Sequence, residues 1–502
     1  MPLPPGTELG AVPRSGGQTE FRVWAPAARS VEVRLDGGGS PLTPEGGGFW
    51  ATALRAAPGE RYAYVLDGSR ELADPCSRCQ PDGLLGRSQV VEAPRVDRLG
   101  LALEELVIYE LHVGAFSDEG TFDGAIPYLP ALRELGVTAI ELMPVATFPG
   151  SRGWGYDGVY AYAPHHSYGG PSGLVRLVEA AHREGLGVIL DVVYNHIGPG
   201  SDALNAFGPY LTAEHATAWG PGVDFTQAGV REWAIRNALM WVESYGIDGL
   251  RLDAVHAIRD GSRPHVLAEL ADRVHATDPR ALVLAETFPG DERPVGQWGH
   301  DGRWDDGLHH ALHALLTGER DGHYAAYGSI DDVVRELSRT PAERQVVYAQ
   351  DHDQVGNRAF GDRLAPELLR VASSVVLFAA QTPLIFMGEE YGEANPFRFF
   401  TDHVDPAAAA AARAGRRREF AAYPGFDRAD LPDPQDPATF RASKLSRRES
   451  PAVRARYRRL LGLRRRLPRE VRVETDGSVL TMRRGDAALV VDFDARTAEL
   501  RA

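Results

Sequence analysis

The chain has 502 residues, which is more than one ordinary core accommodates and predicts two or three domains. Its composition, 43% hydrophobic and 25% charged, is typical of a folded globular protein. The net charge of −15, from 69 acidic and 54 basic residues, excludes the basic footprint that nucleic-acid binding requires. A neutral ligand such as a sugar makes no such demand.

The first residues, MPLPPGTELGAV, contain neither a basic segment nor an apolar one, so we expect no secretory signal and a cytoplasmic protein. The longest apolar stretch, residues 371–387, is interrupted by polar residues and a proline. It is also shorter than the roughly 20 residues that a membrane-spanning helix needs. We therefore expect a buried helix followed by a strand in this stretch.

Residues 1–95 predict an amino-terminal β-sandwich domain. Segments rich in β-forming residues are separated by Gly/Pro turns, and the glycine triplets 37–39 and 46–48 mark one turn region. The expected strands are 20–24, 30–35, 50–53 and 61–66.

A lone C-x-x-C, formed by Cys76 and Cys79, lies in this domain. A structural zinc site needs four ligands, and the chain has no second pair of cysteines. A redox motif is expected to open a helix after a strand, whereas DPCSRCQPDG is typical of a turn. We expect two thiols without a dedicated role.

Residues 96–425 predict a (β/α)8 TIM barrel, the α/β class of fold. Short apolar strands alternate here with helical stretches, which is typical of parallel βαβ units. A long loop rich in Gly, Pro, Tyr and His, residues 144–172, follows the second strand. The eight expected strands are 106–112, 137–143, 188–193, 249–253, 282–286, 303–305, 345–350 and 384–387.

Residues 426–502 predict a small carboxyl-terminal β domain. An Arg/Ala-rich stretch, residues 406–467, predicts helices at the end of the barrel domain and at the start of this terminal domain. Four short β segments then finish the chain, at 471–474, 479–483, 488–493 and 498–500.

Polar residues gather where four of the predicted barrel strands end, which is the rim that carries the active sites of such barrels. The third strand carries Asp191 before Asn195 and His196, the fourth carries Arg251, Asp253 and His256, the fifth ends at Glu286, and His352 and Asp353 follow the seventh. Each carboxylate alone also fits a helix cap or a loop ligand, Asp191 most of all. The agreement of four strand ends favours one catalytic site.

Asp253 and Glu286 suit the chemistry of glycoside hydrolysis. This reaction needs two carboxyl groups, one to attack or stabilise and one to protonate the leaving oxygen. Arg251 faces the same side of its strand as Asp253, two residues away, and is expected to hold Asp253 ionised. Asp353 would then stabilise positive charge on the sugar ring, and neighbouring imidazoles would bind sugar hydroxyls.

Four motifs in this order and spacing resemble the signature regions of the α-amylase superfamily: DVVYNH (191–196), GLRLDAVH (249–256), AET (285–287) and DHDQVGN (351–357). The resemblance implies that Asp253 is the nucleophile, Glu286 the acid/base and Asp353 the transition-state stabiliser. It also implies that Arg251, Asn195, His196 and His352 support the sugar.

Further stretches resemble the maltooligosyltrehalose trehalohydrolases, a family within that superfamily: WGYDGV (154–159), MGEEYGE (387–393), FFTDH (399–403) and PDPQDPATFRASKL (432–445). FRVWAP and VEVRLDG resemble the sandwich of enzymes that act near branch points or on modified glucans. The resemblance implies retaining hydrolysis of the α-1,4 bond beside a terminal trehalose. The chemistry requires no cofactor, because the carboxylates supply the acid and the nucleophile, and we assign no metal ligands. It also implies functional pairing with a maltooligosyltrehalose synthase.

Additional substrate contacts are expected from the rim and its loops: Trp154, Tyr156, Asp157, His256, Asp306, His309, His310, Gln354 and Asn357. Aromatic side chains that are candidates for stacking on sugar, or for packing the rim, are Trp154, Tyr156, Trp219, Trp298 and Phe400.

Three positions depart from the family pattern. Asp351 stands where many relatives carry Asn, and Gly307 and Leu308 stand where an acidic and an aromatic residue are expected. Alternatives therefore stay open: an α-1,4-glucan branching enzyme or other α-amylase-type glucan hydrolase, or a non-catalytic glucan-binding protein. The complete set of carboxylates argues against the last of these.

Overall fold

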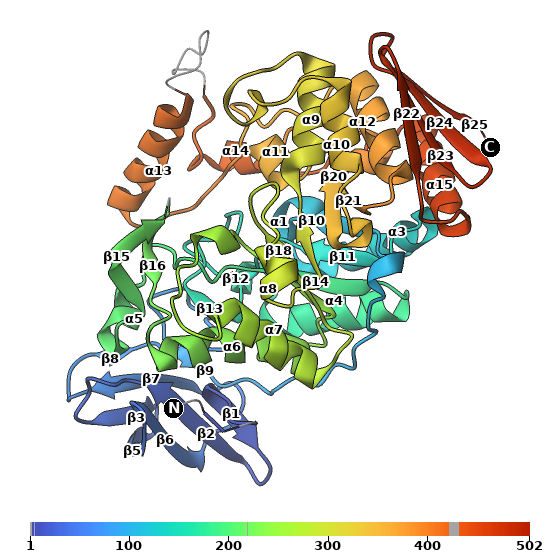
Figure 1. The fold of residues 1–502 in the computed structure, drawn as a ribbon. Coiled ribbons are helices and arrows are strands. Elements are labelled where there is room, and N and C mark those ends of the chain that lie inside the picture. The colour runs from blue at the N-terminus through green and yellow to red at the C-terminus, as the bar shows by residue number, and fades with distance from the viewer. Residues whose placement is uncertain (1–2, 5, 218, 421–430, 502) are drawn as a thin grey trace.

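The structure is a computed structural model that describes residues 3–4, 6–217, 219–420 and 431–501. Figure 1 shows a central barrel with the amino-terminal strands, in blue, on one side and the carboxyl-terminal sheet, in red, at a distant end. No helix in the described part of the chain is both long and apolar enough to cross a membrane. The apolar stretch 371–387 forms the end of a buried helix and a barrel strand, as predicted.

The barrel is closed by eight parallel strands, in the order β10-β11-β14-β17-β18-β19-β20-β21. All eight predicted strands are confirmed, several of them shorter than predicted. Their side chains are buried on both faces, which is why their sequences are nearly continuous apolar runs. The strands are β10 Ile108–Leu111, β11 Ala139–Leu142, β14 Gly187–Val192, β17 Gly249–Leu252, β18 Leu282–Glu286, β19 Gly302–Trp304, β20 Gln345–Tyr348 and β21 Thr382–Phe386.

Helices surround the barrel, and short helices begin or interrupt its loops. They are α1 Val113–Phe116, α2 Phe122–Ala125, α3 Leu129–Leu135, α4 Gly170–Arg183, α5 Asp202–Phe207, α6 Ala228–Glu243, α7 Val266–Thr277, α8 Arg293–Gln297, α9 Asp306–Thr317, α10 Ile330–Leu337, α11 His352–Gly356 and α12 Pro366–Phe378.

Two hairpins extend the rim. The predicted long loop after the second barrel strand holds the antiparallel pair β12 Ala146–Thr147 and β13 Tyr160–Pro164. A second pair, β15 Leu211–Thr217 and β16 Gly220–Val223, follows the third barrel strand and was not predicted. No residue of β15 is buried, and only Gly222 and Val223 of β16 are, so the sequence lacks the apolar alternation that identifies a half-buried strand.

The amino-terminal domain is the predicted sandwich of two sheets, β1-β2-β6-β5 and β4-β3-β7-β8, with β9 added to β7. The turn region marked by glycine triplets also contains two short strands, β4 and β5. The strands are β1 Gly10–Arg14, β2 Gln18–Trp24, β3 Val31–Leu35, β4 Gly38–Pro41, β5 Thr43–Gly46, β6 Phe49–Arg55, β7 Arg61–Leu66, β8 Glu71–Leu72 and β9 Ser88–Gln89.

Helix α6 joins this sandwich to the barrel. A Cβ at Gly229 would lie 2.1 Å from the ring of Trp24, so only glycine allows this approach. Arg236 donates hydrogen bonds to the main-chain oxygens of Leu3 and Pro4, at 3.1 and 2.8 Å. Most residues of α6 are buried, because the helix lies between the barrel and the sandwich.

Cys76 and Cys79 are free, buried thiols in the sandwich. Burial raises the pKa of Cys76 well above its usual value and that of Cys79 to about 11, so both are protonated at neutral pH. The described residues contain no cluster of side chains suited to hold a metal ion.

The described residues of the carboxyl-terminal region form helices and a four-stranded antiparallel sheet, β22-β23-β24-β25, as predicted. Its elements are α13 Pro406–Glu419, α14 Pro437–Ala442, α15 Pro451–Arg466, β22 Arg472–Asp476, β23 Val479–Arg484, β24 Ala487–Asp492 and β25 Thr497–Arg501.

Candidate active site

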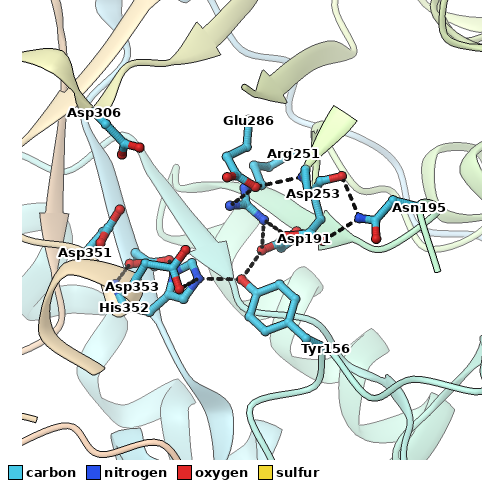
Figure 2. A network of polar contacts seen from close by, with 12 residues as sticks. Tyr156, Asp191, Asn195, Arg251, Asp253, Glu286, Asp306, Asp351, His352 and Asp353 are labelled. Atoms are coloured by element: carbon cyan, nitrogen blue, oxygen red, sulfur yellow. Dashed lines mark hydrogen bonds and ion pairs between the residues drawn. The ribbon is translucent and has the colours of Figure 1, made fainter. Parts of the chain in front are cut away.

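One buried arginine connects three carboxylates at the rim (Figure 2). Arg251 on β17 donates from Nη1 to Asp191 Oδ2 at 2.7 Å and to Asp253 Oδ1 at 2.9 Å. Its Nη2 donates to Glu286 Oε2 at 3.1 Å. The predicted contact between Arg251 and Asp253 is therefore present, and Asp191 belongs to the same network rather than to a helix cap.

Asp253 follows β17 and is almost fully buried. Its Oδ2 accepts a hydrogen bond from Asn195 Nδ2 at 2.6 Å, while its Oδ1 accepts one from Arg251. Each oxygen thus faces a donor, an arrangement that suits an ionised carboxylate.

Glu286 ends β18 and accepts a second hydrogen bond at Oε2, from the main-chain N–H of Ala254 at 2.7 Å. Ala254 adopts a φ of 40°, in the left-handed region that residues with a Cβ seldom occupy. This strained backbone aims the amide at the carboxylate, and strain of this kind is concentrated at functional sites. The side chain of Glu286 is 20% exposed, compared with 9% for Asp253.

Asp353 lies in the first turn of α11, which Asp351 caps by accepting the N–H of Gln354 at 2.7 Å. The side chain of Asp353 is 41% exposed, and its Oδ1 accepts a hydrogen bond from Asn357 Nδ2 at 2.9 Å. It is the most accessible of the three predicted catalytic carboxylates.

His352 lies behind Asp353 and is held from both sides. Its Nδ1 lies 2.5 Å from Glu110 Oε1, and its Nε2 lies 2.7 Å from the hydroxyl of Tyr156. Burial lowers the pKa of His352, but the carboxylates of Glu110 and Asp353 outweigh burial and raise the pKa well above its usual value. The ring is therefore an imidazolium that donates from both nitrogens.

The hydroxyl of Tyr156 in turn donates to Asp191 Oδ2 at 2.7 Å, which joins the His352 and Arg251 groups (Figure 2). Burial raises the pKa of Asp191 to about 7, against the opposing charge of Arg251. The floor of the site is thus one continuous polar network.

The three predicted catalytic carboxylates share one cleft of about 230 Å³. Aromatic and polar side chains from several loops complete it. The lining residues are Trp154, Tyr156, Asp157, His196, Trp219, Asp253, Ala254, Glu286, Asp353, Asn357 and Phe399. An aromatic wall with a few polar groups is the kind of surface on which sugar rings bind.

Several predicted contact residues lie outside the cleft lining. His309 and His310 on α9 are buried, the first against Ala349 O at 2.8 Å and the second stacked on His323. Neither side chain lines the cleft, and their predicted contact with substrate stays a prediction. His256, also absent from the cleft lining, packs its ring against that of Phe288, with the ring centroids 3.9 Å apart.

Two of the aromatic candidates for sugar stacking are buried away from the cleft. Phe400 is fully buried against His112 and Phe440, and Trp298 stacks on His265. Both pack the protein interior, which was the alternative for this group. Phe399, next to Phe400, lines the cleft instead.

Two residues that the sequence prediction missed are buried glutamates on the first two barrel strands. Glu110 holds His352, and both carboxylate oxygens of Glu141 lack a hydrogen-bond partner among the described residues. Burial, and next the charge of Glu110, raise the pKa of Glu141 well above its usual value. The available signal was an acidic residue inside an apolar barrel strand.

Asp306 and Gln354 lie together beside the cleft. Asp306 accepts hydrogen bonds from the hydroxyl of Tyr348 and from Gln354 Nε2, the latter at 3.3 Å. Burial raises the pKa of Asp306 to about 7.

Comparisons with known proteins agree with this geometry. A model of the alpha amylase catalytic domain matches residues 97–208, and one of carbohydrate-binding module 48, the isoamylase amino-terminal domain, matches residues 8–77. The malto-oligosyltrehalose trehalohydrolase of Saccharolobus solfataricus is 40% identical, over 96% of this chain and 92% of that protein. The enzyme of the same name from Deinococcus radiodurans is 41% identical, over 92% and 84%.

Among solved structures, an alpha-amylase candidate from Salmonella typhimurium superposes with a TM-score of 0.87. It is 36% identical and covers 96% of this chain and 92% of its own. The likeness therefore extends over the sandwich, the barrel and the carboxyl-terminal sheet together.

Proposed function

The chain belongs to the malto-oligosyltrehalose trehalohydrolase family, and from that premise we propose that it hydrolyses the α-1,4 bond between a maltooligosaccharide and a terminal trehalose, releasing trehalose. The observation that supports this proposal best is the meeting of Asp253, Glu286 and Asp353 in one aromatic cleft. The substrate is uncharged, in keeping with a site whose charges are paired within the protein.

In the first step, Asp253 attacks the anomeric carbon while Glu286 protonates the oxygen of the departing trehalose. The donors from Arg251 and Asn195 hold the two oxygens of Asp253 in place for attack. Glu286, which is more exposed, reaches the leaving oxygen from the cleft side.

In the second step, Glu286 takes a proton from water, and the water releases the glucan from Asp253 with retained configuration. Retention requires the two carboxyl groups to lie about 5–5.5 Å apart. The reducing end of the freed maltooligosaccharide is then the α-anomer. Proton NMR spectra taken in the first minutes of reaction should record it, and an initial β-anomer would contradict retention.

Asp353 stabilises the positive charge that develops on the sugar ring, and it lies where the carboxylate is open to the cleft. His352, Tyr156 and Asn357 fix its surroundings by hydrogen bonding. We assign direct sugar contacts to His196, which lines the cleft. The proposed chemistry needs no cofactor, since carboxylates supply both nucleophile and acid.

A reaction that consumes a trehalose-ended glucan needs an enzyme that makes one. We therefore propose functional pairing with a maltooligosyltrehalose synthase, which converts the terminal α-1,4 link of a glucan to an α,α-1,1 link. A cytoplasmic site for the pair stays a prediction.

The test is to incubate the protein with maltotriosyltrehalose and measure free trehalose, with Asp253→Asn as the inactive control. Release of trehalose by the wild type alone supports the proposal. New α-1,6 links in amylose would instead indicate a branching enzyme, and equal cleavage of every internal bond an ordinary amylase. No activity on any of these glucans, in the wild type as in Asp253→Asn, would indicate a glucan-binding protein.

A further inference from the structure

Two rim loops are joined side by side at the cleft. Asp402, in the loop after β21, accepts hydrogen bonds at Oδ2 from the N–H and hydroxyl of Ser151, at 2.8 and 2.9 Å. Its Oδ1 pairs with Arg152 at 2.8 Å. The indole N–H of Trp154 donates to the main-chain oxygen of Arg398 at 3.0 Å. The loop after β21 thus fixes the loop that carries cleft residues Trp154 to Asp157.

The loop after β21 is itself held from outside by the segment 434–443. Thr401 donates from its N–H to Pro434 O at 2.9 Å, and His403 donates from its N–H to Gln435 Oε1 at 3.0 Å. Arg398 donates from its N–H to Ser443 Oγ at 3.0 Å. This outer segment does not line the cleft, so its influence on substrate passes through the inner loop.

His403 is the side chain through which this arrangement reaches the cleft. Its Nε2 lies 3.6 Å from Asp157 Oδ2, and the side chain is only 7% exposed. Its Nδ1 is buried without a hydrogen-bond partner within the described chain. Asp157 lines the cleft and is 34% exposed, so its carboxylate is shared between His403 and the substrate space.

The charges around Asp157 also indicate that His403 acts on its carboxylate. Burial raises the pKa of Asp157, while the imidazoles of His403 and then His196 oppose that increase. His196 lines the cleft, so the carboxylate has one imidazole toward the substrate space and one behind it. The ring behind it is placed to fix the direction of the carboxylate oxygens.

We propose that His403 is a positioning residue for substrate recognition, which orients the Asp157 carboxylate to accept hydrogen bonds from sugar hydroxyls. The inference rests on the proposed function, because it takes an α-glucan as the occupant of the cleft. Hydroxyl donors approach a carboxylate oxygen near the plane of the carboxylate, so losing the imidazole that faces Asp157 Oδ2 at 3.6 Å weakens binding of ground state and transition state alike.

Three substitutions at one position separate the donor from the bulk of the ring. His403→Gln keeps an amide N–H at the reach of Nε2, His403→Asn places its amide short of Asp157, and His403→Leu removes the donor. For maltotriosyltrehalose, we expect Asn and Leu each to raise KM about 10-fold with kcat within about 3-fold, and Gln to restore most of the loss.

A double-mutant cycle tests whether His403 acts through Asp157. Asp157→Asn should raise KM at least as much as His403→Leu, and the double variant should be no worse than Asp157→Asn alone. Val404→Ala, at the neighbouring residue that is 79% exposed, is the matched control and should leave both constants unchanged. Thermal unfolding of each variant identifies any that is misfolded. If His403→Leu is misfolded, the comparison of His403→Asn with His403→Gln tests the proposal instead.

Unchanged KM in His403→Asn and His403→Leu, equal losses in Asn and Gln, or additive effects in the cycle would overturn the proposal. Calorimetric binding of maltotriosyltrehalose provides a second readout that needs no turnover. If the wild type releases no trehalose but hydrolyses maltopentaose, the same cycle on maltopentaose still decides the role of His403, and only the proposed function fails.

Discussion

Two sectors of the same barrel rim hold carboxylates by opposite means. At β14, β17 and β18, the guanidinium of Arg251 lies between the carboxylates of Asp191, Asp253 and Glu286. At β19 and β20, Asp306 has no ion pair among the described side chains, and burial raises its pKa to about 7. Burial also raises the pKa of Asp351 well above its usual value. The two sectors therefore differ in the partners of their acids, while burial acts in both, since it also raises the pKa of Asp191 to about 7 beside Arg251.

The largest expected effect separates the two sectors directly. Asp253→Asn should lower kcat on the order of 1,000-fold, about 4 kcal/mol of transition-state stabilisation, because the amide cannot form the glycosyl intermediate. Asp306→Asn should change kcat by less than about 10-fold at pH 6, where Asp306 is mostly protonated. Similar losses in steady-state kinetics of the two variants would remove the distinction between the sectors.

Arg251→Lys tests whether the sector at β14, β17 and β18, the paired sector, needs the planar guanidinium group of Arg251. Lysine cannot hold three carboxylates in one plane, so we expect kcat to fall about 10-fold or more, at least about 1.4 kcal/mol. The control is Arg303→Lys on β19, another fully buried arginine, which pairs with Asp305 at 3.0 Å. The control should lose stability but keep turnover within about 3-fold. An unchanged Arg251→Lys enzyme would place this arginine outside the mechanism.

The smallest expected effect is a pH dependence of folding stability that comes from the sector at β19 and β20, the burial sector. The pKa of Asp306 is about 7 when folded, above its ordinary value of 3.8, so the folded protein retains this proton longer than the unfolded chain. The stability that this raised pKa contributes is fully present below pH 3.8 and is lost as the pH rises through about 7. Asp306→Asn should therefore raise Tm relative to wild type at pH 8 and change it little at pH 4. An equal shift in Tm at both pH values would contradict the raised pKa.

The barrel and the paired sector were predictable because both depend on local sequence order. Alternating apolar strands and helices fix the eight strands, and Arg251 and Asp253 share a strand face by simple spacing. Glu286 follows on the next strand. The motifs thus predicted, without tertiary information, three carboxylates that share one cleft.

The burial sector and the rim loops were less predictable because they depend on contacts between distant segments. His309 and His310 follow a strand end like the proposed catalytic residues, but in α9 they pack against Ala349 and His323. Phe399 faces the cleft and Phe400 does not, a choice made by packing against His112. No spacing rule in the sequence carries that information.

The most direct test of the account is the ratio of kcat/KM for maltotriosyltrehalose to kcat/KM for maltopentaose. The two substrates differ in linkage geometry and not in charge, so discrimination must come from placed hydrogen bonds and shape in the cleft. We expect a ratio of about 100 or more, roughly 2.7 kcal/mol of differential transition-state binding. Comparable values for the two substrates would contradict the trehalohydrolase assignment, while the glycoside hydrolase chemistry of Asp253 and Glu286 would remain to be judged by the Asp253→Asn variant.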